Sequence, residues 1–258
     1  MSQHIIISGK QIKQIAERLN DFLRIKPLEE RYKIPVPELP YFCQSLNKKI
    51  QAESDSYKQN KILKENLKDC FSKTISDQKK LELVNYIVNT WGGISEVKQS
   101  RRKNLIFQDI DSSDSVEMNI SESDYIASRS KVLSFLKPEE YVICDSRVIF
   151  TLNWLLLITR SKDKLIQFSE LELRNRICKS YKLSYLLDKF KIKPFDNIID
   201  KYTDYLDIVK ILTNELKKTN TDWKLYSTEM LLFQIADDLE YGIPSLIRDF
   251  LFSKISSI

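Results

Sequence analysis

Glycine and proline are scarce in this chain, which has 4 glycines and 7 prolines among 258 residues. Architectures built from β-hairpins need many more residues of these types, because tight turns depend on their backbone geometry. The scarcity therefore argues against a hairpin-rich fold, while a hydrophobic content of 42% is typical of a folded chain. We expect an all-α fold.

Histidine and closely spaced cysteines are also lacking. The single histidine is His4, and Cys43, Cys70, Cys144 and Cys178 lie far apart with no CxxC pair among them. Cysteine-ligated zinc sites and iron–sulfur clusters need closer spacing or more ligands. We expect no metal, no cofactor and four free thiols in a reducing cytoplasm.

Long hydrophobic runs and a strong charge imbalance are absent as well. No apolar run approaches the ~20 residues that span a bilayer, and the N-terminus lacks the pattern of a secretory signal. We therefore expect a cytoplasmic protein without membrane contact. The net charge of +5, from 41 basic and 36 acidic residues, is compatible with nucleic acid without being specific for it.

Hydrophobic periodicity divides the chain into three regions. Residues 1–94 are predicted to be an N-terminal helical region, 95–124 a polar loop and 125–258 a helical core, which could also form one continuous domain with 1–94. Gly92-Gly93 predicts the end of a helix. The spacing of apolar residues predicts helices over about 10–25, 165–190 (one or two helices), 197–216, 229–239 and 243–255.

The polar loop contains two charged stretches of opposite sign. Arg101, Arg102 and Lys103 could contact a DNA backbone and displace its counterions, or they could be a solvated loop. The stretch 109–124 is acidic and could contact a protein partner, although a spacer is the simpler interpretation.

Two further patterns have structural interpretations. The basic residues of one helical segment recur along a single face, which predicts a solvent-exposed stripe consisting of Lys58, Lys61, Lys64 and Lys68. The three tryptophans lie among apolar neighbours and are expected in the core at positions Trp91, Trp154 and Trp223.

The most informative segment runs from Ser128 to Leu157. An apolar helix ends near Pro138, and a short connection leads to Asp145-Ser146, which opens a second helix with apolar residues on nearly every face. Asp145 or Ser146 is predicted to cap this helix by accepting hydrogen bonds from free backbone N–H groups. A carboxylate at the mouth of a buried helix could also act as a catalytic group, although a cap alone is the simpler interpretation.

This segment resembles the helix-hairpin-helix DNA glycosylase superfamily, in particular its 8-oxoguanine DNA glycosylase-like branch. The resemblance rests on Ser130-Lys-Val-Leu-Ser-Phe135, the Lys137-Pro138 turn and Tyr141-Val-Ile-Cys-Asp-Ser-Arg-Val148. It implies a multi-helix glycosylase-like fold. It also implies that Asp145 stabilises positive charge on the sugar while a flipped-out base is expelled, with Arg129, Lys131 and Arg147 contacting DNA or the base.

Two features of the family have no counterpart here. The stretch 119–127 has no glycine where the family's hairpin carries a phosphate-binding turn, and no lysine lies nearly twenty residues before Asp145, where bifunctional members have a nucleophile. Lys131 lies too near Asp145 in sequence to replace that lysine. A monofunctional glycosylase therefore fits better than a Schiff-base lyase.

Two functions follow from the resemblance, and the sequence leaves open whether the chain is an enzyme. The first is a base-excision hydrolase of DNA repair that binds duplex DNA and excises a modified base with Asp145. The alternative is a catalytically inactive glycosylase-fold module that binds DNA or a protein, in a setting such as a bacterial or phage conflict system.

Overall fold

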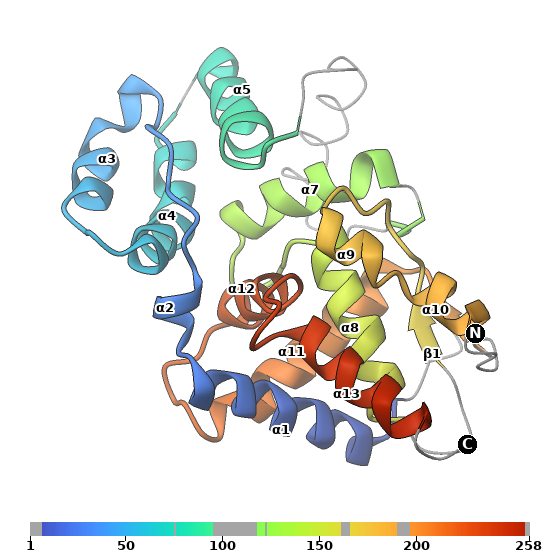
Figure 1. Ribbon diagram of the computed structural model, residues 1–258. Helices are drawn as coiled ribbons and strands as arrows, with labels where there is room; N and C mark the ends of the chain where they lie inside the picture. Colours follow the sequence, from blue (N-terminus) through green and yellow to red (C-terminus); the bar gives the residue numbers. More distant parts are fainter. Residues whose placement is uncertain are drawn as a thin grey trace. The chain divides into compact units, whose positions relative to one another are not determined.

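The computed structural model describes residues 7–74, 76–94, 118–121, 123–160, 166–189 and 197–255, and they are mostly helical (Figure 1). The chain divides into two compact units. The first consists of Met1–Pro27, Met118–Ser123 and Cys144–Ile258, and the second of Leu28–Glu117 and Asp124–Ile143. Each unit thus combines segments that are distant in sequence. The three basic residues Arg101, Arg102 and Lys103 lie outside the described residues, as does most of the acidic stretch 109–124.

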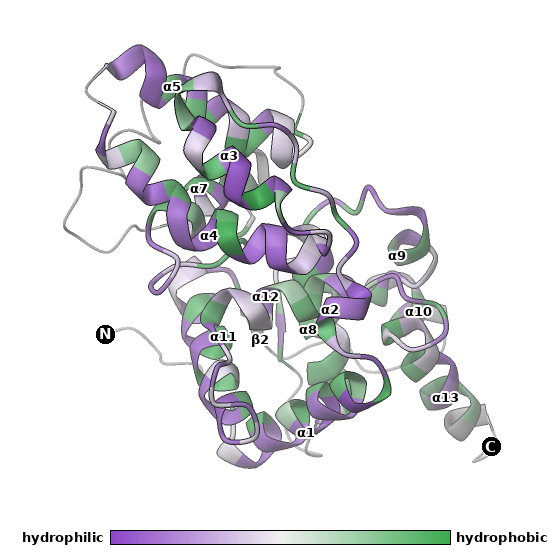
Figure 2. Ribbon diagram, turned by 90° about the vertical axis from the view of Figure 1, so that its left-hand side faces the viewer, coloured by the Kyte–Doolittle hydropathy of each residue, from purple (hydrophilic) through white to green (hydrophobic). Residues whose placement is uncertain are grey.

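The first unit is built around helix α8, Ser146–Ile158, which is buried along most of its length. α8 is strongly hydrophobic in Figure 2, and the helix contacts α12, α13, α1 and the short strand β1. The remaining elements of this unit are α1 (Gly9–Ile25), β1 (Ile166–Phe168), α9 (Arg176–Ser180), α10 (Leu183–Lys189), β2 (Asn197–Ile199), α11 (Tyr202–Lys217), α12 (Leu225–Gln234) and α13 (Ile243–Ile255).

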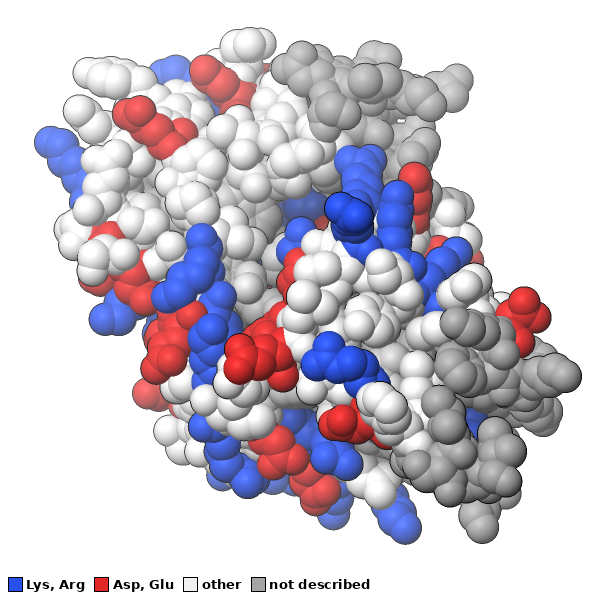
Figure 3. Space-filling model, viewed as in Figure 1, with Lys and Arg blue, Asp and Glu red and all other residues white. Residues whose placement is uncertain are grey.

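Helix α1 shows how the amphipathic pattern positions the outer helices of this unit. Ile12, Ile15, Leu19 and Phe22 recur at three- and four-residue spacing and are buried. α1 packs against α11, and the Ser8 side chain caps its N-terminus by accepting from the Gln11 N–H. On the face drawn in Figure 3, acidic and basic side chains are intermixed over the region of α1.

A two-stranded parallel sheet departs from the expected all-α fold. β1 pairs with β2 so that Ile166, Gln167 and Phe168 lie opposite Asn197, Ile198 and Ile199. The helices predicted over 165–190 and 197–216 are therefore wrong at their N-terminal ends, and α9, α10 and α11 begin later in the sequence.

The cause is a buried amide on α8. Asn153 accepts a hydrogen bond from the Phe168 N–H at 2.7 Å and donates one to the Phe168 carbonyl at 3.0 Å. Both backbone groups of Phe168 are thereby satisfied in an extended conformation, so the local helical pattern is overridden.

The second unit consists of short helices around its own apolar core. Its elements are α2 (Leu28–Arg31), the 3-10 turn η1 (Tyr41–Cys43), α3 (Gln44–Gln51), α4 (Ser56–Ser72), α5 (Asp77–Asn85), the π-helical stretch η2 (Tyr86–Trp91) and α7 (Ser123–Leu136). α3 packs on α4, and α5 continues into η2. The core includes Leu63, Leu67, Ile87 and Phe135.

The predicted helix stop at Gly92-Gly93 is confirmed. η2 ends at Trp91, and Gly93 has a φ of 63°, a left-handed conformation that favours glycine. A Cβ at Gly92 would lie 2.6 Å from the Val88 carbonyl oxygen and 2.9 Å from Lys131 Cδ. Close packing therefore requires glycine at position 92, and backbone conformation favours it at position 93.

Candidate functional site

Asp145 caps helix α8, as the sequence predicts. Its backbone is extended, with φ −112° and ψ 153°, and its carboxylate accepts a hydrogen bond from the Arg147 N–H at 2.9 Å. The side chain is half-buried. A carboxylate at this place interacts favourably with the positive end of the helix dipole, and the cap fixes its position.

Arg147 extends from the same end of α8 towards the segment after α12. Its guanidinium group forms an ion pair with Asp237, with an Nη1–Oδ2 distance of 3.2 Å. The guanidinium carbon also lies 4.4 Å from the centroid of the Phe233 ring, within the range of a cation–π contact. Arg147 is thus held by two side chains of one neighbouring segment.

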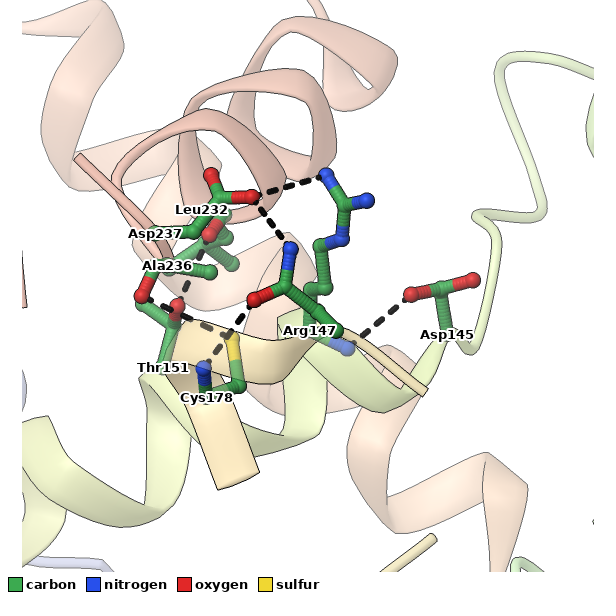
Figure 4. Close-up of polar contacts among 8 residues, drawn as sticks. Asp145, Arg147, Thr151, Cys178, Leu232, Ala236 and Asp237 are labelled. Carbon is green, nitrogen blue, oxygen red and sulfur yellow. Dashed lines mark hydrogen bonds and ion pairs between the residues drawn. The ribbon is translucent and has the colours of Figure 1, made fainter. Parts of the chain in front are cut away.

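The Asp237 carboxylate connects this pair to α9. Asn175 donates its amide hydrogen to Asp237 Oδ2 at 2.7 Å and accepts from the Cys178 N–H at 3.0 Å, so it caps α9. The Cys178 thiol contacts the Ala236 carbonyl oxygen at 3.7 Å. Figure 4 shows this chain of contacts around Arg147 and Asp237, with Asp145 on the other side of the Arg147 backbone.

Burial and nearby carboxylates control the ionisation of Cys178. Its pKa is raised to about 12, mainly because the thiol is buried, with further contributions from Asp237 and Asp145 that Arg147 partly offsets. A thiol of this kind is unreactive at neutral pH. Cys178 is therefore a structural residue of the cluster.

A buried tyrosine of α11, Tyr205, interacts electrostatically with Asp145. Burial raises the pKa of Tyr205 well above its usual value, and the nearby Cys144, Tyr202, Glu229 and Asp145 add to this effect. Glu229 is itself only 4% exposed. Two carboxyl groups, those of Asp145 and Glu229, thus lie near the buried Tyr205 hydroxyl.

The other predicted contact residues belong to the second unit. Arg129 and Lys131 lie on α7, where Arg129 is half-buried and Lys131 is 5% exposed. The Lys131 side chain runs close to Gly92. The structure thus brings together Asp145 and Arg147 in one unit, and Arg129 and Lys131 in the other.

Lys64 of α4 is a residue that sequence reasoning placed incorrectly. It is 1% exposed, so the predicted exposed stripe is wrong at this position. Its ammonium group donates to Ser134 Oγ at 2.9 Å and lies 4.3 Å from the centroid of the Phe135 ring. The spacing contained the signal, because Lys64 follows buried Asn60 by four residues and precedes buried Leu67 by three.

The tryptophan prediction is confirmed for Trp154 and Trp223, which are 1% and 5% exposed. Trp91 is half-buried, packs edge-on against Phe135 and donates its indole N–H to Asn60.

Asp237 and Asn175 are members of the cluster that the sequence did not single out. They lie 62 positions apart, and no local spacing relates them.

Within the described ranges, no three histidine, cysteine, aspartate or glutamate side chains gather in a way that could hold a metal ion. Nor is any helix among those residues both long and apolar enough to cross a membrane.

Comparisons with known proteins give no match: no protein-family model fits the chain, and searches of curated proteins and of solved structures find no significant similarity.

Proposed function

We propose that this chain is a DNA glycosylase-like protein that binds duplex DNA and excises a modified base by hydrolysis of its N-glycosidic bond. Asp145 is the catalytic residue in this proposal. The reaction needs a carboxylate close to the sugar, because positive charge develops there as the base departs, and the enzyme must flip the nucleotide out of the duplex to reach it.

The observation that carries the proposal is the position of Asp145 at the N-terminal end of buried α8. A hydrogen bond from the Arg147 N–H helps to fix the carboxylate, and the side chain is still only half-buried. A carboxylate fixed in this way stabilises a developing cation without reorganisation during the reaction.

The decisive experiment measures release of a base from duplexes that each contain one modified nucleotide. We expect excision from one class of duplex, and a loss of about 100-fold or more in the single-turnover rate with Asp145→Asn. Asparagine is as good a helix cap as aspartate, so this variant tests the charge rather than the cap.

A matched control is Asp55→Asn. Asp55 caps α4 by accepting from the Lys58 N–H at 2.8 Å, and it lies in the other unit. It should leave the rate unchanged. The proposal fails if the wild-type protein releases no base from any duplex, or if Asp145→Asn is as fast as wild type.

A second candidate function is a catalytically inactive module that binds DNA or a protein. The ion pair between Arg147 and Asp237 favours it, because the arginine that follows the catalytic position is already bound within the protein. The lack of glycine over 119–127 points the same way.

Salt-dependent binding separates the two DNA-binding functions from a role in binding a protein. Affinity for a duplex should fall steeply as salt rises, with a slope that reports the number of phosphate contacts. Arg129→Gln should reduce this slope by about one, whereas Arg24→Gln, on an exposed arginine paired with Asp21 on α1, should not. No affinity for DNA at low salt would contradict both DNA-binding functions and leave a protein partner.

A further inference from the structure

The second unit contains a pocket of about 480 Å³ formed by α3, the C-terminal half of α4 and the beginning of α5. Its lining carries three lysines and one carboxylate, so its potential is positive. Hydroxyl groups, the Asn66 amide and one cysteine complete the polar surface. The lining includes Lys49, Asp69, Cys70, Lys73, Thr74 and Lys79.

Cys70 reaches this pocket from α4, where it is half-buried. A second cysteine lies directly behind it. Cys43, at the end of η1, is 1% exposed and hydrogen-bonds to the Cys70 sulfur through its thiol. Two thiols in hydrogen-bond contact are close enough to interact chemically, and one of them faces a space that a small molecule can enter.

The two thiols differ in acidity for reasons that the geometry makes plain. The hydrogen bond from Cys43 lowers the pKa of Cys70, and the nearby Lys73 ammonium lowers it further, against the opposing effects of burial and Asp69. The same hydrogen bond and burial raise the pKa of Cys43. Cys70 is therefore the thiol that ionises first, and the thiolate is the reactive form of cysteine.

The other two cysteines do not share this environment. Cys144 and Cys178 are both 0% exposed, and burial raises the pKa of Cys178. Within the part of the chain that the structure describes, Cys70 alone combines a cationic environment, a pocket and a neighbouring thiol.

We propose that the Cys70–Cys43 pair is a site of reversible oxidation, at which a hydroperoxide that enters the lysine-lined pocket oxidises Cys70 and Cys43 then closes a disulfide. Cysteines that sense oxidants have a thiol of low pKa, access to solvent and a second thiol nearby that closes the disulfide. The adjacent lysines stabilise the anionic oxygen that leaves in the first step.

The chemistry proceeds in two balanced steps. The Cys70 thiolate attacks one oxygen of the hydroperoxide, the O–O bond breaks, and the departing alkoxide or hydroxide takes a proton. Cys70 is oxidised by two electrons to the sulfenic acid, and the peroxide is reduced. The Cys43 sulfur then attacks the Cys70 sulfur, its thiol proton accompanies the departing hydroxyl group as water, and the disulfide forms. A dithiol reductant restores both thiols.

The test exposes the full-length protein to hydrogen peroxide and maps the product by mass spectrometry. In the wild type we expect one disulfide, which joins the peptides that contain Cys43 and Cys70 and disappears on treatment with dithiothreitol. Cys43→Ser should stop at the first step, so that Cys70 gains one oxygen atom and reacts with dimedone. Cys178→Ser, which alters a buried thiol outside the pocket, should form the disulfide as the wild type does.

A pair of lysine variants on α4 tests the role of the pocket. Lys73→Gln should slow oxidation of Cys70 several-fold, because it removes the cation beside the sulfur. Lys68→Gln should leave the rate unchanged, since Lys68 is exposed on the same helix and does not line the pocket.

Three results would overturn the proposal. They are oxidation of all four cysteines at equal rates, a disulfide that involves Cys144 or Cys178, and a sulfenic acid on wild-type Cys70 that persists without closing onto Cys43. Dimedone labelling of the wild type needs no substitution, so the inference remains testable if a variant folds poorly. None of these results depends on whether the protein acts on DNA.

Discussion

Cys178 in the first unit and Cys70 in the second unit are each influenced by at least one carboxylate and a cation. Cys178 is influenced by Asp237, Asp145 and Arg147, and Cys70 by Asp69 and Lys73. The pKa of Cys178 is raised and that of Cys70 is lowered. The residue types are alike, but burial dominates at Cys178, whereas a hydrogen bond from a second thiol dominates at Cys70.

The contrast extends to the surroundings of the two cysteines. Around α8, polar groups bind one another: Arg147 pairs with Asp237, Asp237 with Asn175, and Asn153 with the backbone of Phe168. In the α3–α4 pocket, polar side chains line open space. Polar residues thus stabilise the fold in the first region and create a surface available to small molecules in the second.

The largest expected difference between the regions is chemical reactivity. At pH 7 and low iodoacetamide concentration, Cys70 should be alkylated about a thousandfold faster than Cys178, because far more of it is thiolate and it faces the pocket. Peptide mapping over time measures both rates in one sample. Equal rates would show that the two environments do not differ as described.

A buried side-chain amide should contribute more to the free energy of unfolding than an amide that lines the pocket. Asn153→Leu leaves the buried N–H and carbonyl of Phe168 without partners, and we expect it to lower the free energy of unfolding by about 3 kcal/mol.

The matched variant is Asn66→Leu, since Asn66 lines the pocket and donates to the Ile62 carbonyl of its own helix. It should cost less than about 1 kcal/mol. Urea unfolding measures both variants, and a similar loss for the two would contradict the distinction.

The pH dependence of stability should reveal the buried thiol. Cys178 keeps its proton in the folded protein up to about pH 12. In the unfolded chain the same thiol ionises at about pH 8.5. Its contribution to stability is therefore complete below that lower value and is lost as the pH rises towards the upper one.

Between pH 7 and 9.5 this loss should amount to about 1 kcal/mol. The same comparison with Cys178→Ala should show a smaller pH-dependent loss, as measured by urea unfolding at the two pH values. An unchanged loss in the variant would mean that Cys178 is not the group that responds.

The smallest expected effect on stability comes from replacing one cation in each region, Arg147 in the first and Lys73 in the second. Arg147→Met removes a partly buried ion pair and a contact with Phe233, and solvent screening limits the expected loss of unfolding free energy to about 1 kcal/mol. Lys73→Met should leave thermal stability almost unchanged, because that lysine lines the pocket. A larger loss for Lys73→Met would place the pocket among the stabilising elements.

Local features of the fold could be predicted well from the sequence. The span of α1, the Asp145 cap and the stop at Gly92-Gly93 all depend on residues within one or two turns of one another. The burial of Lys64 was also present in the spacing, but its charge argued for exposure. Its Ser134 and Phe135 partners come from α7 and show why that argument was wrong.

The candidate site was predictable only in part. Asp145 follows from its position before an apolar helix, whereas Asp237, Asn175 and Phe233 come from other segments of the first unit and have no common sequence pattern. The roles of Arg129, Lys131 and Arg147 in contacting DNA remain predictions. The same holds for Arg101, Arg102 and Lys103, which lie outside the described residues.

The sequence by itself determined a mostly helical chain, the ends of several helices and a fixed carboxylate at the start of a buried one, because propensity, capping and periodicity act over a few residues. The tertiary structure alone decided that Asn153 draws residues 166–168 into a strand, that Arg147 pairs with Asp237, and that Cys43 lies behind Cys70. These contacts join distant segments, and packing of the whole unit determines which of them meet.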